Sequence, residues 1–135
     1  MTRAYVLDAN ALLAFLNDET GADRIERLLT DALRNNSRLL VSVVNWGEAF
    51  YVLWQRRGEE ATKRLMFSLS QAPFQLVPAD MPHITKAAEI KAVHNIPYAD
   101  AIAAALAEIR TATLVTSDRH FEKLGRRIQV LWLRR

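Results

Sequence analysis

Short apolar runs alternate with longer amphipathic segments along this chain, and no other feature constrains its fold as strongly. The runs are rich in β-branched, aromatic and leucine residues, as buried strands are. Five of them are expected as strands, at residues 5–7, 38–43, 74–77, 113–115 and 129–133. Strands that alternate with helices build a mostly parallel sheet with helices on its faces. The sequence therefore predicts an α/β domain.

The segments between these runs predict six helices, at residues 11–16, 22–33, 45–57, 59–69, 84–94 and 99–110. The second of them repeats apolar residues at helical spacing, at Ile25, Leu28 and Leu29. The last is rich in alanine and follows Pro97, a residue type favoured at a helix start. The chain shows no internal repeat and no linker, so we expect one folding unit over residues 1–135.

Composition narrows the possible functions. The chain has 135 residues, of which 50% are hydrophobic, which is enough for one domain with a core. It contains no cysteine, so disulfides, thiolate nucleophiles and cysteine-bound zinc are excluded, and any metal must be held by oxygen or imidazole. The net charge of +3 tolerates a polyanionic partner without proving one.

The apolar segments are too short for a membrane span, which needs roughly 18 uninterrupted apolar residues. An acidic residue, Asp8, also comes before any apolar stretch long enough for a signal peptide. We therefore expect a soluble, cytoplasmic protein without membrane contact.

Several motifs of nucleotide-binding and hydrolytic enzymes are absent, namely GxxxxGKS/T, GxGxxG, HExxH and GxSxG. Phosphate-binding loops of the common types and serine hydrolases are therefore excluded. The three histidines, His83, His94 and His120, have no spacing that would place two of them on one helix face. We interpret them as helix-end or surface residues.

Four acidic residues occupy related places in the predicted fold. Asp8 directly follows the first strand, and Asp118 follows the fourth. Glu48 lies one turn into the helix after the second strand, and Asp100 lies in the first turn of the alanine-rich helix. In an open parallel sheet, ligands bind outside the carboxyl ends of the strands. All four carboxylates are therefore expected on one side of the domain.

Such a cluster needs a counter-charge. Two carboxylates about 4 Å apart repel by about 4 kcal/mol at an effective dielectric constant of 20, so a cluster takes up protons or binds cations. Mg²⁺ and Mn²⁺ prefer carboxylate and water oxygens. Taken singly, each acid also has a structural explanation, as a turn residue, a helix N-terminal charge or a solvated side chain. The ordered set of four favours a metal site.

At four segments the chain resembles the PIN domain family, and within that family the VapC toxins of prokaryotic toxin–antitoxin pairs. The segments are YVLDANALLAFL (5–16), VSVVNWGEAFYVLW (41–54), IPYADAIAAALAEI (96–109) and TLVTSDRHFEKL (113–124). The resemblance assigns the acidic quartet to Asp8, Glu48, Asp100 and Asp118. It also matches Asn10 and Thr116 to small polar positions near the first and last acids.

The resemblance implies a single PIN-like domain whose five-stranded parallel sheet, in the order 3-2-1-4-5, is sandwiched by helices. It further implies an endoribonuclease dependent on Mg²⁺ or Mn²⁺ that forms a homodimer and is silenced by a cognate antitoxin of the VapB type.

The residues suggest how such an enzyme would work. We expect Asp8 and Asp100 to hold the principal metal, with Asp118 completing the site, and Glu48 to bind a second ion or orient water. Asn10 and Thr116 would fix the carboxylates.

Arginine side chains are the candidates for holding an RNA substrate. Arg119 is the best placed because it adjoins the last acid, and the pairs 126–127 and 134–135 are further candidates.

Other proteins that place aspartates at strand ends fit less well. A phosphatase of the haloacid dehalogenase type expects DxD where this chain has Asp8-Ala9-Asn10, and a phosphoacceptor receiver domain expects a lysine after its last strand. Within the PIN family, two alternatives remain open. One is a housekeeping RNA-processing nuclease, and the other is a non-catalytic RNA-binding module, in which the acidic positions are usually broken.

Overall fold

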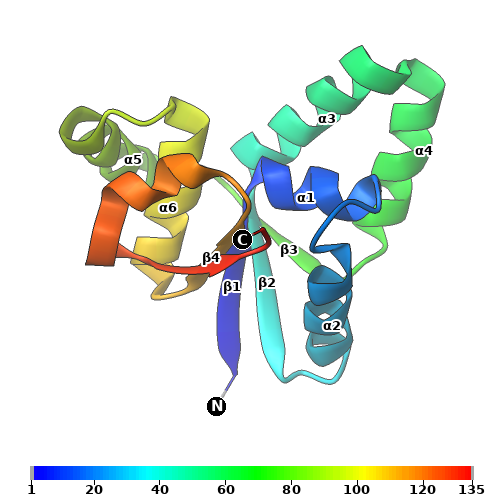
Figure 1. Ribbon diagram of the computed structural model, residues 1–135, viewed down its shortest axis with the longest axis horizontal. Helices are drawn as coiled ribbons and strands as arrows, with labels where there is room; N and C mark the ends of the chain where they lie inside the picture. The colour runs from blue at the N-terminus through cyan, green and yellow to red at the C-terminus, as the bar shows by residue number, and fades with distance from the viewer. Residues whose placement is uncertain (1, 135) are drawn as a thin grey trace.

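The computed structural model describes residues 2–134 (Figure 1), so Met1 and Arg135 of the expected 1–135 domain lie outside the described residues. The elements follow one another as β1 (Arg3–Leu7), α1 (Ala9–Leu16), α2 (Ala22–Leu33), β2 (Ser37–Ser42), α3 (Val43–Arg57), α4 (Glu59–Ser70), β3 (Phe74–Val77), α5 (Met81–His94), α6 (Tyr98–Arg110), β4 (Thr113–Thr116), the 3₁₀ segment η1 (Arg119–Arg127) and β5 (Gln129–Trp132).

The strands form one five-stranded sheet in the order β3-β2-β1-β4-β5, and every neighbouring pair is parallel. Tyr5 of β1 pairs with Leu39 of β2 on one side and with Thr113 of β4 on the other. The predicted α/β class and strand order are confirmed. Because all strands run the same way, their carboxyl ends share one edge of the sheet, and the central neighbours β1 and β4 end side by side there.

Helices cover both faces of the sheet, with α5 and α6 on one side and α1 to α4 on the other (Figure 1). The strand residues alternate accordingly. Val6 and Leu114 belong to the apolar cluster beneath α5 and α6, whereas Leu7 and Val115 belong to the cluster beneath α1 to α4. Each strand therefore contributes to two cores, as expected for a parallel sheet buried on both faces.

The alanine-rich helix α6 packs directly on the sheet. Its residues 101–107 are all buried, five of them alanines whose small side chains allow close approach. This close packing was predicted and fixes the first turn of α6, including Asp100, against the carboxyl edge. Within residues 2–134, no helix combines the length and apolar character needed to cross a membrane.

Several element boundaries differ from the prediction by one to three residues, and at two of them a side-chain cap starts a helix early. β2 ends at Ser42 instead of Val43, since the Ser42 hydroxyl accepts a hydrogen bond from the amide of Val44 and begins α3. α5 begins at Met81 instead of residue 84, since the Asp80 carboxylate caps it by accepting from the amide of His83 at 3.0 Å. The 3₁₀ segment η1 was not predicted at all.

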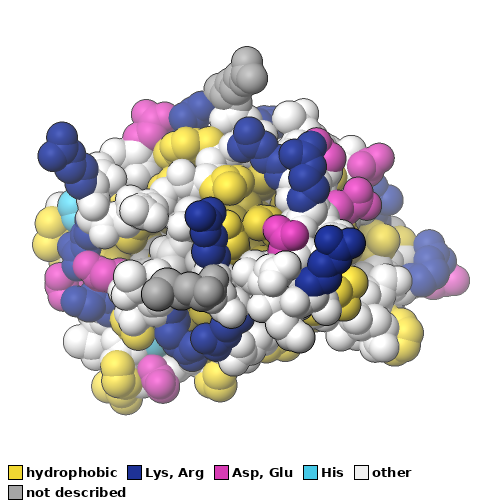
Figure 2. Space-filling view, turned by 90° about the horizontal axis from the view of Figure 1, so that it is seen from below, with side chains coloured by type: hydrophobic (Ala, Val, Ile, Leu, Met, Phe, Trp, Pro, Cys, Tyr) yellow, Lys and Arg dark blue, Asp and Glu magenta, His cyan; other side chains and the backbone are white. Residues whose placement is uncertain are grey.

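The amino edge of the sheet lies opposite the edge where the strands end. Viewed from this side, Lys and Arg side chains surround an area of apolar side chains near the centre (Figure 2). Arg3, Arg38 and Arg110 line a hollow there, beside Tyr5 and Thr113 of β1 and β4. Asp8 and Asp118 follow the carboxyl ends of β1 and β4, so they lie at the opposite edge of the sheet.

Candidate active site

Asp8 lies where β1 passes into α1, and it is held from two directions. Its Oδ1 accepts a hydrogen bond from the amide of Ala11 at 2.8 Å, which caps α1. Its Oδ2 accepts one from the hydroxyl of Thr116, at the end of β4, at 2.5 Å. Only 2% of Asp8 is exposed. The carboxylate is therefore fixed in the interior of the carboxyl edge.

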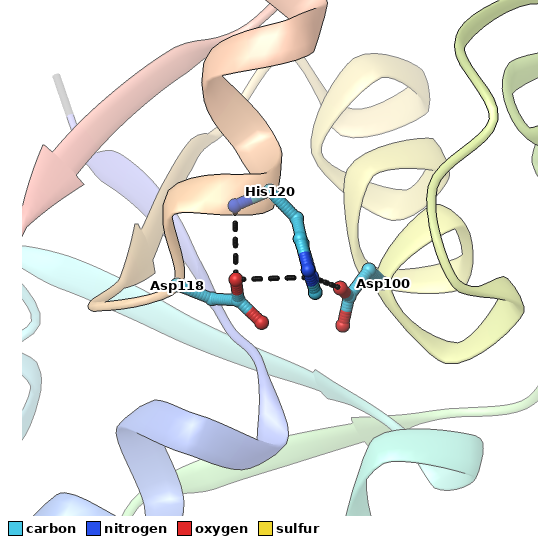
Figure 3. Close-up of side chains that lie close together, drawn as sticks. All are labelled: Asp100, Asp118 and His120. Atoms are coloured by element: carbon cyan, nitrogen blue, oxygen red, sulfur yellow. Dashed lines mark hydrogen bonds and ion pairs between the residues drawn. The ribbon is translucent and has the colours of Figure 1, made fainter.

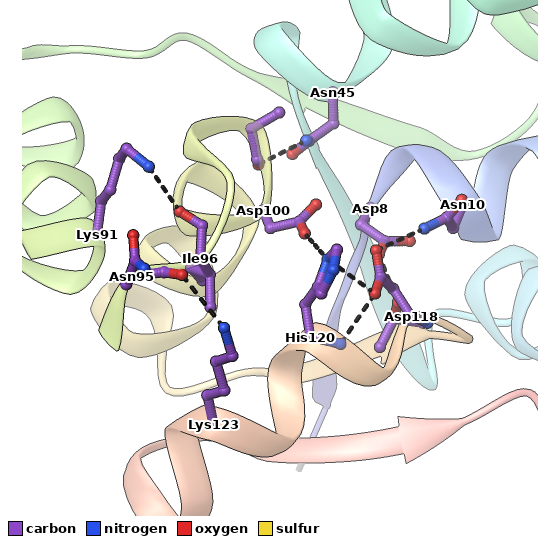
Figure 4. Close-up of polar contacts among 12 residues, drawn as sticks. Asp8, Asn10, Asn45, Lys91, Asn95, Ile96, Asp100, Asp118, His120 and Lys123 are labelled. Atoms are coloured by element: carbon purple, nitrogen blue, oxygen red, sulfur yellow. Dashed lines mark hydrogen bonds and ion pairs between the residues drawn. The ribbon is translucent and has the colours of Figure 1, made fainter. Parts of the chain in front are cut away.

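Thr116 also links Asp8 to the last acid of the quartet. The amide of Asp118 donates to the Thr116 hydroxyl at 2.9 Å, and the side-chain amide of Asn10 donates to Oδ2 of Asp118 at 3.2 Å. The side-chain contacts cross over relative to the sequence: Asn10, which follows the first acid, donates to the carboxylate of Asp118, and Thr116, which precedes the last acid, donates to the carboxylate of Asp8. Asp8 and Asp118, far apart in the chain, lie close together at adjacent strand ends (Figure 4). The hydroxyl of Thr116 connects them.

Asp100 approaches from α6, and a histidine lies between it and Asp118. Nδ1 of His120 is 3.1 Å from Oδ2 of Asp100 and 3.1 Å from Oδ1 of Asp118 (Figure 3). The same Oδ1 accepts from the backbone amide of His120 at 2.9 Å, which fixes the start of η1. Within residues 2–134, these three residues form a group whose ligand atoms all lie within 4.8 Å of one another.

Glu48 reaches the same region from α3 and is half-buried. Burial raises the pKa of its carboxyl, and the charges of Asp100 and Asp118 raise it further. No hydrogen bond in the described part of the chain ties Glu48 to the other acids. Asp8 and Glu48 therefore border the compact group of Asp100, Asp118 and His120 without being part of it.

The electrostatics of this edge favour a bound cation. Burial raises the pKa of Asp8 to about 7, against the opposing effect of its hydrogen bonds to Thr116 and Ala11. Burial also raises the pKa of Asp100, although its contact with His120 opposes the shift. Within residues 2–134, none of the ion pairs of Lys or Arg reaches any of the four acids. Carboxylate oxygens and one imidazole nitrogen, without a fixed cationic partner, fit a divalent metal ion.

His120 is the residue that sequence reasoning left out of the site. It does lie at the start of a helical segment, as interpreted, but its ring turns toward the acids. The only available signal was its position two residues after Asp118. That spacing becomes informative once Asp118 is known to cap η1, because the cap places residue 120 over the carboxylate.

Basic side chains border the acidic group on one side. The guanidinium of Arg119 lies 4.6 Å from the centre of the Trp132 ring, and it also donates to the carbonyl of Arg134 at 3.2 Å. Next to it, a small polar pocket of about 190 Å³ is lined by residues that include Asn10, Arg56 and Arg134. Arginines and the acidic group therefore share the carboxyl edge.

The other candidate arginines are placed differently. Arg126 and Arg127 line a hollow with Thr111 and Ala112, which precede β4, so they lie toward the amino end of that strand. Arg127 is also paired with Glu108 at 3.0 Å. The expectation that this pair rims the site is therefore wrong, and Arg135 lies outside the described residues.

Comparisons with known proteins agree with this architecture. The family model of the PIN domain matches residues 5–127. A search of curated proteins found no match. Among solved structures, the DNA-bound VapBC of Salmonella typhimurium has a TM-score of 0.78 at 18% identity, covering 99% of this chain and 100% of that one.

Two further structures have slightly lower TM-scores. The promoter-bound VapBC2 of Rickettsia felis has a TM-score of 0.75 at 16% identity, covering 95% of this chain and 97% of that one. VapC20 of Mycobacterium tuberculosis, described as a toxin that cleaves the sarcin–ricin loop, has a TM-score of 0.72 at 17% identity, covering 90% and 95%. At such identities the likeness concerns the fold. Because the family model covers nearly the whole chain, this protein belongs to the PIN domain family.

Proposed function

We propose that this protein is a divalent-metal-dependent endoribonuclease and the VapC-type toxin of a toxin–antitoxin pair. One observation carries the nuclease proposal: three aspartates from separate elements meet at the carboxyl edge, and no lysine or arginine of residues 2–134 forms an ion pair with them. Nuclease activity is general in the PIN family. The toxin assignment is supported by the similarity to VapBC and VapC structures.

The acidic residues would divide the work of phosphodiester hydrolysis. Asp8 and Asp100 would hold a Mg²⁺ or Mn²⁺ ion, with Asp118 binding it directly or through water. Such an ion would supply positive charge that activates water and neutralises the phosphate. Glu48, whose pKa is raised by burial, would orient the attacking water or bind a second ion. Thr116 and Asn10 would keep the carboxylates in place through the hydrogen bonds described above.

An RNA backbone would enter past the arginines. Arg119 is held over Trp132, so its guanidinium is partly ordered before substrate binds. Arg56 and Arg134 line the polar pocket on the Asn10 side of the acids, where a neighbouring phosphate would lie. These contacts would offset the repulsion between RNA and the acidic group.

The proposed partners follow from the same similarity. We propose a VapB-type antitoxin as the inhibitor, a homodimer as the working form, and a cytoplasmic location where RNA is available. A housekeeping RNA-processing nuclease of the same fold is the main alternative. Expression without the antitoxin tests it, because a toxin arrests growth and a housekeeping enzyme does not.

Cleavage by the purified protein tests the nuclease proposal. The wild type should cut RNA in Mn²⁺ or Mg²⁺ and stop when EDTA is added, and Asp8→Asn should lose this activity while keeping its circular dichroism spectrum. Asp31→Asn, which changes an exposed acid on α2, is the matched control and should cut normally. Metal-independent RNA binding without cleavage would identify a non-catalytic module. An unchanged rate in Asp8→Asn would refute the role of Asp8.

A further inference from the structure

We propose that His120 donates a ring nitrogen to the metal held by Asp100 and Asp118, and that this ligand makes the site prefer Mn²⁺ over Mg²⁺. The inference rests on the proposed function, since it assumes that the carboxyl edge binds a divalent ion. It goes further by adding a nitrogen ligand and a metal preference, neither of which the acidic quartet implies.

The first argument is geometric. Neighbouring ligands of an octahedral ion with bonds of about 2.1 Å lie about 3 Å apart. Nδ1 of His120 lies 3.1 Å from a carboxylate oxygen of Asp100 and 3.1 Å from one of Asp118. The three atoms come from η1, from α6 and from the end of β4, and they face one another (Figure 3). Their spacing therefore suits three ligands of one ion.

The second argument concerns how His120 is held. Its side chain is 52% exposed, so the ring is not placed by packing in the core. The position is instead fixed by the backbone, because the amide of His120 donates to Asp118 and Asp118 in turn hydrogen-bonds to Thr116. The hydrogen bonds that orient Asp118 thus also orient His120. A half-exposed ring held beside two acids remains accessible to an ion from solvent.

The chemistry of the donor sets the preference. Mg²⁺ is a hard ion that takes oxygen ligands, whereas first-row transition ions accept imidazole and increase in affinity from Mn²⁺ to Cu²⁺. A site of carboxylates alone has no nitrogen with which to discriminate against Mg²⁺. With His120 as a ligand, the site gains affinity for Mn²⁺ and gains little for Mg²⁺.

A simpler role for His120 predicts the opposite change. If the imidazole only balances the charge of Asp100 and Asp118, it competes with the metal for them. Removing it would then strengthen the binding of Mn²⁺ and Mg²⁺ alike. If it is a ligand, removing it weakens Mn²⁺ binding and leaves Mg²⁺ binding nearly unchanged. The sign of the effect therefore separates the two roles.

Calorimetric titration of the metal-free protein with Mn²⁺ and with Mg²⁺ measures this sign. In His120→Ala, the Kd for Mn²⁺ should rise about tenfold or more, while the Kd for Mg²⁺ changes far less. His94→Ala removes another helix-end histidine, one that lies beside Arg127, and should leave both constants as in the wild type. Tighter or unchanged Mn²⁺ binding in His120→Ala would overturn the proposal.

Electron spin echo spectroscopy of the Mn²⁺-loaded wild type gives a second readout, and its main result does not depend on the folding of a variant. It should show a coupled ¹⁴N nucleus, which disappears in His120→Ala and persists in His94→Ala. Mn²⁺ binding without nitrogen coupling would refute the role of His120 and leave the proposed nuclease intact. If the wild type bound neither ion, the metal site itself, and with it the proposed function, would fail.

Discussion

Burial of the Asp8 carboxylate should make the metal-free protein less stable as the pH rises. The folded state raises the pKa of this group from 3.8 to about 7, mainly through burial. Between these values the folded protein keeps a proton that the unfolded chain releases, so the free energy of unfolding falls with increasing pH. The loss begins near pH 4 and is complete above pH 7. At about 1.4 kcal/mol per pH unit, it amounts to at most about 4 kcal/mol.

Urea denaturation in EDTA measures this effect. Between pH 5.5 and pH 8, the wild type should lose part of that 4 kcal/mol, and Asp8→Asn should lose much less. The asparagine keeps an oxygen that can cap α1 but carries no charge, so the variant should be the more stable protein at pH 8. A smaller slope should remain in the variant, because burial raises the pKa of Asp100 and Glu48 as well.

Added Mn²⁺ should stabilise the wild type more at pH 8 than at pH 5.5, because the ion binds the deprotonated carboxylates. Asp31→Asn controls for the general effect of removing an acid. A wild-type stability that stayed constant or rose between pH 5.5 and pH 8 would refute the reasoning, as would an unchanged slope in Asp8→Asn.

Two further variants test the contacts around the acids. Thr116→Val removes a buried hydroxyl that contacts Asp8 and the amide of residue 118, so metal affinity measured by calorimetry should fall about 10- to 100-fold. Thr116→Ser keeps the hydroxyl and should keep the affinity. An equal loss of affinity in both variants would show that the hydroxyl does not support metal binding. Arg56→Ala should weaken RNA binding and reduce the slope of log affinity against log salt concentration by about 0.7. Arg57→Ala changes the neighbouring arginine, which does not line the pocket, and should leave the slope unchanged. Equal slopes in the two variants would show that Arg56 does not contact RNA.

The parts of the site that follow strand ends were predictable from the sequence. Asp8 comes directly after a short apolar run and Asp118 two residues after the end of another strand, and the parallel sheet brings such ends to one edge. Asp100 was predictable for a similar reason. The small side chains of the alanine-rich helix allow it to pack closely against the sheet, and Asp100 lies in the first turn of that helix. In each case, hydrophobic patterning fixes the element, and the element fixes the position of the acid.

His120 and η1 escaped prediction because no pattern of that kind covers them. The segment Arg119–Arg127 buries only Phe121 and Leu124, and Gly125 interrupts its helical backbone, so its apolar residues show no helical period. The position of His120 depends on the hydrogen bond from its amide to the Asp118 carboxylate, and the direction of its ring on the contacts of Nδ1 with Asp100 and Asp118. A sequence gives the spacing of these two residues but not that contact.

The packing that makes the carboxyl edge rigid also removes the Asp8 carboxylate from water. Asp8 is buried because β1 and β4 are central strands, covered on both faces, and Thr116 holds it there through a hydroxyl that also accepts from Asp118. Withdrawing the carboxylate from water raises the free energy of its charged form, and a divalent ion lowers it again. Burial of the charged carboxylate therefore destabilises the metal-free protein, and binding of the ion offsets this destabilisation. Metal affinity and fold stability are thus coupled through Asp8.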